Sequence, residues 1–324
     1  MAGNVTIGVQ ADPAEEPEWG AFARRVEKLG FDGLVVADHP GSGSAPFVAL
    51  AAAATVTHRL RLGSYVANAG AWEPIALASQ VATLDLLSAG RAVLGVGAGH
   101  TPAEWTMRGL HYPSPAERVD RMIELLETTQ RLLSDDEVTF TGEHITLQGG
   151  RLETPRPLQQ PLPLLVGGNG RRVLRYAAAH ADIVGLSGLG RTLEDGHRHE
   201  VRWAREQIGA SIEQILAAAT AAGREPELEA LVQHVEITDD AEASARRLTD
   251  RVSGLTVEQV LTAPFVWVGT ADEIASQLHA HLERFGISRY VVRAAWVDSA
   301  RQVLSSLSSP ARKNGRCDRV PNRK

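Results

Sequence analysis

The chain has little of what disulfides, thiolate metal clusters and membrane spans require. Its 324 residues include a single cysteine, Cys317, which excludes an intramolecular disulfide and a thiolate metal cluster and favours a reducing, cytoplasmic setting. The longest apolar run covers residues 47–56, whereas a membrane-spanning helix needs roughly 20 residues. The N-terminus also lacks a basic segment that leads into an apolar one. We therefore expect no membrane partner and no export.

Basic residues are scarce outside the C-terminal end. Residues 1–308 hold 27 Lys or Arg and 38 Asp or Glu, a net charge of −11, while residues 309–324 hold six basic residues and one acidic residue. Because affinity for nucleic acid comes mainly from clustered Lys and Arg, this acidic body argues against a nucleic-acid partner. We expect residues 1–308 to form a single domain and residues 309–324 to be a disordered basic tail.

Short segments rich in Val, Ile and Leu alternate with Ala-rich helical patterns. That rhythm is typical of βα units around a parallel sheet. Eight segments are expected to be strands: 5–10, 33–37, 60–67, 92–97, 162–167, 182–186, 231–237 and 290–293. Helices are expected over 18–29, 75–87, 116–133, 170–179 and 271–285, with stop signals at Gly30, Gly90 and Gly286. Eight such units predict a (β/α)8 TIM barrel with insertions.

Two stretches interrupt the rhythm. Residues 139–163 contain Thr-Gly-Glu-His, a Gly-Gly pair and four prolines, which indicates a hairpin and an extended loop before the fifth strand. Residues 191–229 are charged and Ala-rich, and we expect them to form helices over the barrel mouth. Insertions of this length usually carry function.

Chemistry in a TIM barrel takes place at the carboxyl ends of the strands. The second predicted strand ends in Asp38-His39, where a neighbouring carboxylate could fix the histidine tautomer and raise its basicity. The alternative interpretation is a helix-capping Asp beside a structural His. The position just before a Gly-Ser loop favours function.

Glycines follow the fourth predicted strand. Gly95-Val96-Gly97-Ala98-Gly99-His100 precedes Glu104, and glycines at positions such as Gly97 and Gly99 let a backbone approach a flat or anionic ligand. The pattern is weak, because a tight turn under a helix would also explain it. A nicotinamide site of Rossmann type would have the motif in the first βα unit and not in the fourth, so it is disfavoured.

A stronger anion site follows the fifth predicted strand. Gly167-Gly168-Asn169-Gly170-Arg171-Arg172 leads directly into a helix, so free amides, a helix dipole and two guanidinium groups are expected to converge there. A turn capped by solvated arginines is the alternative.

Histidine pairs do not predict a metal centre. His197 and His199, like His279 and His281, lie in charged helical patterns in which positions i and i+2 point apart, so we interpret both pairs as solvated surface. No Gly-x-Ser-x-Gly elbow and no Walker loop is present.

Taken together, these motifs resemble the luciferase-like monooxygenase superfamily, and within it the coenzyme F420-dependent (8-hydroxy-5-deazaflavin) oxidoreductases of actinobacterial type. The resemblance spans residues 5–307. It rests on Gly30-Phe31-Asp32-Gly33 with Asp38-His39, on residues 60–63, 90–99, 117–121 and 161–170, and on Val268-Gly269-Thr270-Ala271-Asp272-Glu273-Ile274. It implies a (β/α)8 barrel, usually a homodimer, with a flavin or deazaflavin over its mouth.

The resemblance also implies roles for particular residues. His39 matches the active-site histidine and Asp38 its acidic neighbour. Tyr65-Val66 falls where the family has a cis peptide behind the ring system, with Ala67 and Asn68 beside the ring. The cofactor phosphate is expected on Gly167, Gly168, Asn169, Gly170 and Arg171. His100 stands where relatives carry Glu or Trp, so the second proton donor is either His100 or Glu104.

The resulting functional hypothesis is an F420-dependent oxidoreductase. It would transfer a hydride between reduced deazaflavin and a small organic substrate with a C=C, C=N or alcohol group. An FMN-dependent luciferase-like monooxygenase is the alternative. A barrel that binds cofactor without catalysis is a third hypothesis, against which Asp38-His39 argues. The mouth loops carry no motif that identifies the substrate.

Overall fold

The computed structural model describes residues 4–134, 137–192, 199–252 and 254–308. The predicted basic tail, residues 309–324, lies outside them, so its predicted disorder stays a prediction.

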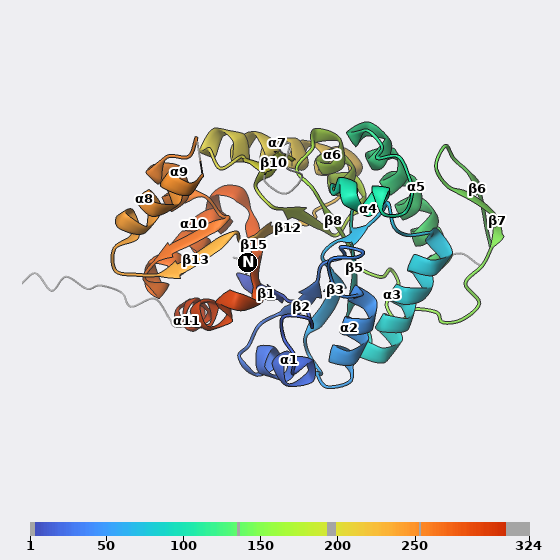
Figure 1. The fold of residues 1–324 in the computed structure, drawn as a ribbon, viewed down its shortest axis with the longest axis horizontal. Helices are drawn as coiled ribbons and strands as arrows, with labels where there is room; N and C mark the ends of the chain where they lie inside the picture. Colours follow the sequence, from blue (N-terminus) through green and yellow to red (C-terminus); the bar gives the residue numbers. More distant parts are fainter. Residues whose placement is uncertain (1–3, 135–136, 193–198, 253, 309–324) are drawn as a thin grey trace, which may run out of the picture.

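Eight parallel strands close into a barrel, which confirms the predicted TIM barrel (Figure 1). The pairing order runs β3-β2-β1-β15-β12-β9-β8-β5, and β3 closes the ring onto β5. The strands are β1 (Thr6–Gln10), β2 (Gly33–Val36), β3 (Arg61–Ser64), β5 (Ala92–Gly97), β8 (Leu164–Gly167), β9 (Ile183–Leu186), β12 (Glu227–Leu231) and β15 (Ile287–Arg293). A two-residue strand, β4 (Ala67–Asn68), adds to the end of β5.

Helices surround the barrel. The helices that follow the barrel strands are α1 (Trp19–Lys28), α2 (Pro46–Ala54), α3 (Pro74–Ser88), α5 (Pro115–Ser134), α6 (Arg171–His180), α7 (Arg205–Ala222), α10 (Ala271–Phe285) and α11 (Val297–Ser308). The predicted stops are confirmed, because Gly30 (φ +90°), Ala89 with Gly90 (φ 57° and +78°) and Gly286 (φ +70°) adopt the left-handed conformation.

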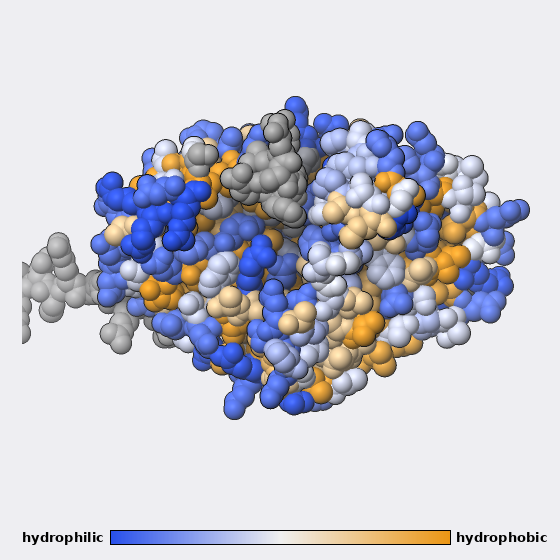
Figure 2. Space-filling model, viewed as in Figure 1, coloured by the Kyte–Doolittle hydropathy of each residue, from blue (hydrophilic) through white to orange (hydrophobic). Residues whose placement is uncertain are grey.

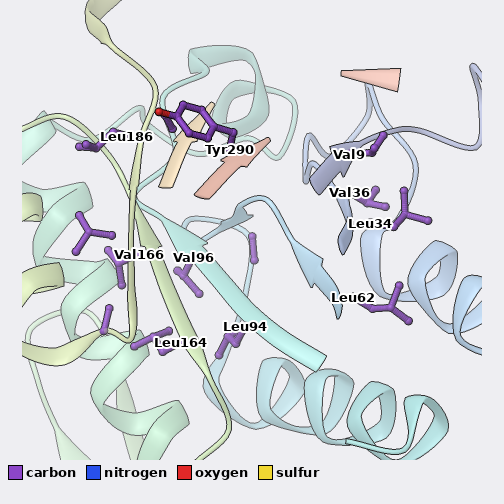
Figure 3. Packing of buried hydrophobic residues seen from close by; sticks show 14 of the residues in the cluster. Val9, Leu34, Val36, Leu62, Leu94, Val96, Leu164, Val166, Leu186 and Tyr290 are labelled. Atoms are coloured by element: carbon purple, nitrogen blue, oxygen red, sulfur yellow. The ribbon is translucent and has the colours of Figure 1, made fainter. Parts of the chain in front are cut away.

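Strand residues alternate between two buried layers. Val9, Leu34 and Leu62 point outward, into the core between strands and helices (Figure 3). Their neighbours Gly8 and Val35 point inward and line a cavity of about 30 Å³. Because both faces are buried, strands such as β2, β5, β8 and β9 consist of apolar residues and glycine, which is why they were recognisable in the sequence.

The seventh strand was predicted wrongly. Residues 231–237 do not form one barrel strand, because β12 ends at Leu231 and His234–Ile237 (β13) pairs with β14 (Val266–Gly269) in a separate sheet. The polar pattern of β12 hid it, since inward-facing Glu229 is buried there against Arg289 at 3.1 Å. α8 (Ala241–Arg251) and α9 (Val257–Thr262) join the two strands of that extra sheet.

The other insertions agree with the sequence only in part. The hairpin predicted within 139–163 is confirmed as β6 (Val138–Thr141) and β7 (Thr146–Gly150). The described part of 191–229 does contain a helix, α7, but its expected place over the mouth is wrong, since it packs beside α6 in the outer ring (Figure 1). β10 (Leu189–Thr192) pairs with β11 (His199–Val201), and residues 193–198 lie outside the described part. α4 (Pro102–Thr106) follows β5, and a 3₁₀ turn, η1 (Ala294–Trp296), follows β15.

The surface mixes hydrophilic and apolar residues on the face shown in Figure 2. Four large apolar side chains on α2 and α3 are exposed: Val48 (70%), Ile75 (42%), Leu86 (42%) and Leu87 (52%). None of the helices formed by the described residues combines the length and apolar character that crossing a bilayer requires.

Candidate active site

The candidate site lies where the strands β2, β4 and β5 end. Asp38 and His39 follow β2, Asn68 ends β4, and Glu104 lies in the first turn of α4, just after β5. The barrel topology brings these segments together although 65 residues separate His39 from Glu104.

His39 is hydrogen-bonded to a buried carboxylate. Its Nδ1 lies 2.8 Å from Oε1 of Glu104, whose side chain is 4% exposed, while the side chain of His39 is 43% exposed. This hydrogen bond raises the pKa of His39 above its ordinary value, and the charge of Asp38 adds to the effect, while burial and Arg293 oppose it. Since Nδ1 is engaged, Nε2 is the nitrogen that faces a ligand.

The expectation that Asp38 would orient His39 is wrong. Asp38 Oδ2 accepts hydrogen bonds from the backbone N–H of Asn68 (3.0 Å) and from Nε1 of Trp72 (2.7 Å). Adjacent residues at a strand end point in different directions, so the sequence neighbour of His39 braces the loop around β4. Glu104 supplies the orienting carboxylate in its place.

Asn68 joins the two carboxylates. Its backbone binds Asp38, its Nδ2 donates to Oε2 of Glu104, and its Oδ1 accepts from the N–H of Gly70 at 2.9 Å. The side chain is buried and both its nitrogen and its oxygen are hydrogen-bonded, so its predicted place beside a cofactor ring would serve to hold Glu104 in position.

His100 and Glu104, the two candidates for the second proton donor, occupy different places. His100 is exposed, and its ring meets that of His39 edge-on with centroids 5.8 Å apart. Glu104 uses both carboxylate oxygens, on His39 and on Asn68. Glu104 is therefore a positioning residue for His39.

The peptide bond between Tyr65 and Val66 is cis, as the family resemblance implied. The Tyr65 ring points into the barrel beside Glu229, and burial raises the pKa of Tyr65 well above its ordinary value, with the charge of Glu229 adding to the effect. Contact between Tyr65 and a ligand would therefore involve its backbone, whose carbonyl accepts from Nε2 of Gln10 at 3.2 Å. Ala67 is fully buried, whereas Val66 is partly exposed.

Gly97 and Gly167 allow Val66 to lie close to the sheet. A Cβ on Gly97 would stand 2.6 Å from Cγ2 of Val66, and a Cβ on Gly167 would stand 3.0 Å from its Cγ1. Gly99, at φ +74°, has Oδ1 of Asn68 2.2 Å from the place of a Cβ. These glycines are thus required by packing, and the side of the mouth where Val66 lies on Gly97 and Gly167 is called the glycine floor below.

The predicted anion site is smaller than the sequence indicated. The N–H of Gly168 donates to the carbonyl of Gly185 at 3.1 Å, and Arg172 forms an ion pair with Asp120, so neither is available. Asn169 donates from Nδ2 to Oγ of Ser187 at 2.6 Å.

What remains of that site is the first turn of α6. Helical hydrogen bonding begins with the N–H of Leu174, and Gly170 provides no side-chain cap. The N–H groups of Arg171 to Val173 therefore point out of the helix end with its positive dipole, next to the exposed side chain of Arg171.

The interpretation of His281 as surface is wrong. It is 6% exposed, with Nε2 3.0 Å from the carbonyl of Thr262 and Nδ1 3.3 Å from the hydroxyl of Tyr290, and burial lowers its pKa. His197 lies outside the described residues, as does the side chain of His199. Within the described part of the chain, no group of three or more His, Cys, Asp or Glu residues could hold a metal ion.

Several residues around the mouth were missed from the sequence. Gln10, Gln233 and Arg293 lie at or just beyond the ends of β1, β12 and β15, and Trp72 binds Asp38. None of them belongs to a motif, so only the alternation along a correctly placed strand could have found them. A pocket of about 410 Å³ behind α4 was also missed, lined by Trp105, Arg108, His111, Arg121 and His144 among others.

The fold and the mouth define a (β/α)8 barrel with a histidine held by a buried carboxylate, a cis peptide after the third barrel strand and a glycine floor beside it. The sequence pattern described as "luciferase-like monooxygenase" matches residues 5–289. The chain belongs to this family.

Two kinds of relative match the chain. The F420-dependent glucose-6-phosphate dehydrogenase of Amycolatopsis mediterranei (strain U-32) is 32% identical over 181 residues, which cover 53% of this chain and 54% of that protein. The chain thus matches about half the length of this curated relative. A coenzyme F420 dependent tetrahydromethanopterin reductase from Methanopyrus kandleri superposes with a TM-score of 0.73 at 19% identity, over 93% of this chain and 97% of that one. A long-chain alkane monooxygenase superposes with a TM-score of 0.75 at 17% identity, over 95% and 92%. These two similarities show the shared fold.

The hydrogen bond between His39 and Glu104 predicts how the pKa of His39 responds to substitution of Glu104. Glu104→Gln should lower the pKa of His39, because the carboxylate that favours the imidazolium is replaced by a neutral amide. The raised folded-state pKa also means that the pair stabilises the fold below the ordinary pKa of histidine, and that this contribution is lost as the pH rises through the folded pKa. NMR of the His39 ring against pH measures the shift. Glu117→Gln, on the exposed start of α5, is the matched control, and an equal pKa in wild type and Glu104→Gln would contradict the assignment.

Proposed function

We propose that this protein is a coenzyme F420-dependent oxidoreductase that acts on a small organic substrate with a C=C, C=N or alcohol/carbonyl group. The observation that carries the proposal is His39, protonatable at Nε2 and held by Glu104 beside a glycine-floored part of the mouth. Further support comes from the relative at 32% identity, which is named for its F420 dependence.

The residues at the ends of β5 and β8 fit a planar cofactor that carries a phosphate. A flat ring can lie against the apolar, partly exposed side chain of Val66, which packs on Gly97 and Gly167. The N–H groups at the start of α6 and the guanidinium of Arg171 suit a phosphate. When bound, a reduced deazaflavin supplies the hydride, while the chain supplies binding, orientation and a proton.

His39 is the residue that we propose to move the proton. Its raised pKa keeps the imidazole protonated to a higher pH than an ordinary histidine, so Nε2 can donate a proton to a substrate atom that gains electrons. In the reverse direction the neutral ring accepts the proton of an alcohol at the same nitrogen. Glu104 keeps the ring orientation and the tautomer the same in both directions.

An FMN-dependent monooxygenase is the second candidate, favoured by the family to which the chain belongs. Equilibrating the protein with F420 and with FMN, and finding which one co-migrates and is reoxidised by a substrate panel of enones, imines and alcohols, separates the two. Binding of FMN alone would overturn the F420 proposal.

Cofactor affinity should depend on Gly170. A Cβ at this position meets nothing within 4 Å, and its φ of −74° suits any residue, so Gly170→Val should fold and yet crowd the start of α6. We expect F420 to bind at least tenfold more weakly, about 1.4 kcal/mol, as measured by deazaflavin fluorescence.

Two other glycines serve as comparisons for the Gly170→Val experiment. Gly168 is a poor choice, because its Cβ would stand 2.8 Å from Cγ1 of Val173 and disturb the helix. Gly209→Ala in α7 is the control, since that position also has open space. If folded Gly170→Val bound F420 with unchanged affinity, the cofactor phosphate would not bind at the first turn of α6.

Turnover should depend on His39. His39→Ala is expected to lose 10²- to 10⁴-fold in kcat, roughly 3 to 5 kcal/mol of barrier, while F420 affinity stays within a few-fold, because the cofactor is held by backbone contacts elsewhere. Stopped-flow oxidation of reduced F420 and equilibrium binding measure the two quantities separately. If kcat and F420 affinity fell together in His39→Ala, His39 would be a residue that supports the cofactor ring. If His39→Ala kept full activity, His100 would be the next proton donor to test.

We also infer a homodimer, in a cytoplasmic setting, built from the single domain 1–308. The exposed apolar residues of α2 and α3 support the dimer. Sedimentation should give twice 34.8 kDa, and Val48→Glu should shift it to the monomer, whereas Leu216→Glu on α7 should not. A monomeric wild type would refute the inference.

A further inference from the structure

We propose that the substrate carries a carboxylate, and that Arg293 at the end of β15 binds it opposite the glycine floor. This inference rests on the proposed function and names the substrate class of the same site. Arg293 belongs to no motif of the sequence and is used by no step described so far.

Strand geometry places Arg293 at the mouth. Gly8 and Val291 line the cavity inside the barrel, and residues two positions further along a strand point to the same side. Those residues are Gln10 and Arg293, which pair with each other in the parallel register of β1 and β15. Gln10 confirms the direction, because its Nε2 reaches across to the carbonyl of Tyr65 at 3.2 Å.

The guanidinium of Arg293 lacks a strong anionic partner. In the described part of the chain its hydrogen bond goes to the neutral Oε1 of Gln233, at a long 3.4 Å, and it forms no ion pair within 4.0 Å. The charged and titratable groups that influence it are Glu15, in the exposed loop after β1, and His39. The side chain of Arg293 is exposed, so a ligand from solution can reach its guanidinium, and desolvation by the surrounding mouth lowers its pKa.

Arg289 provides a comparison within the same strand. It lies four residues earlier, so it points to the same side, and it is surrounded by Asp32 at 3.0 Å, Glu229 at 3.1 Å and Glu227 at 3.5 Å. A structural arginine in this barrel therefore has its carboxylates built in. Arg293, which unlike Arg289 is exposed, has an amide oxygen in their place, so its guanidinium is open to a carboxylate that arrives from solution.

The mouth has two unlike halves. At the ends of β5 and β8 the apolar side chain of Val66 lies on Gly97 and Gly167 and offers a surface for a ring, whereas the ends of β1 and β15 present Gln10 and Arg293. His39 follows β2, which pairs with β1 next to β15, so it lies two strands from Arg293 at the same end of the barrel, and that positive charge lowers the pKa of His39. A substrate held by Arg293 would thus lie within reach of the proposed proton donor.

The charge at this half favours a monoanion. Arg293 offers one positive charge, and Glu15 opposes the approach of a dianion such as phosphate. Oε1 of Gln10 is a buried acceptor with no hydrogen-bond partner among the described residues, so a hydroxyl or amine of the ligand has a place to donate. The combination describes a small carboxylic acid with a neighbouring donor group.

Binding of benzoate, with benzamide as its neutral isostere and inorganic phosphate as the dianion, tests the proposal without turnover. The His39 ring, followed by NMR, reports each titration of the full chain. We expect benzoate to bind wild type in the millimolar range or tighter and to raise the pKa of His39, because it neutralises Arg293. Arg293→Gln should weaken benzoate at least tenfold and leave benzamide unchanged, and Arg293→Lys should recover part of the affinity. Arg24→Gln on α1 removes the same charge at an exposed position and is the control.

The outcomes are distinct. Equal benzoate affinity in wild type and Arg293→Gln, or no benzoate binding to wild type, would overturn the proposal. If only phosphate binding depended on Arg293, the ligand group at this position would be a phosphate and not a carboxylate. F420 affinity, measured by fluorescence on the same samples, should stay within twofold in Arg293→Gln. If wild type did not bind F420 but still bound benzoate through Arg293, the cofactor assignment would be overturned and the carboxylate proposal would stand.

Discussion

The contact of Val66 with the strands beside it determines the form of the mouth. Its methyl groups lie so close to Gly97 and Gly167 that no side chain fits at either position. Val66 therefore gives the ends of β5 and β8 an apolar surface, while Gln10, Gln233 and Arg293 place polar side chains at or just beyond the ends of β1, β12 and β15. A flat ligand and a polar ligand can then be bound side by side by rigid strand ends, which is the arrangement that transfer between a cofactor and a substrate requires.

Buried carboxylates hold the loops above this floor. Glu104 ties α4 to His39 and to Asn68, while Asp38 ties the end of β2 to the backbone of Asn68 and to Trp72. Burying these charges is costly, and hydrogen bonds offset the cost at Asp38 and Glu104. The geometry of His39 thus depends on residues from three separate βα loops.

Much of this fold was readable in the sequence, because strands buried on both faces are continuous apolar runs and helices end at glycine. β12 was not, since Glu229 and its partner Arg289 are buried inside the barrel, and a charged residue there resembles a loop. Strand ends identified His39 as a candidate, and the family resemblance identified the cis bond of Tyr65-Val66. Which carboxylate meets His39 could not be predicted, because Glu104 is distant along the chain and Asp38 is adjacent but points elsewhere. The sequence also could not predict that Arg172 pairs with Asp120, or that Arg293 pairs with no carboxylate in the described residues. Each of these depends on a single contact between segments that are distant along the chain.

A crystal structure of the complex with F420 tests most directly whether the cofactor and the substrate bind at opposite sides of the mouth. The account predicts the phosphate on the N–H groups of Arg171 to Val173 and the ring against Val66 and Gly97, with Nε2 of His39 and the guanidinium of Arg293 open to one shared space. A ring that covers Arg293, or a phosphate bound away from the start of α6, would contradict it.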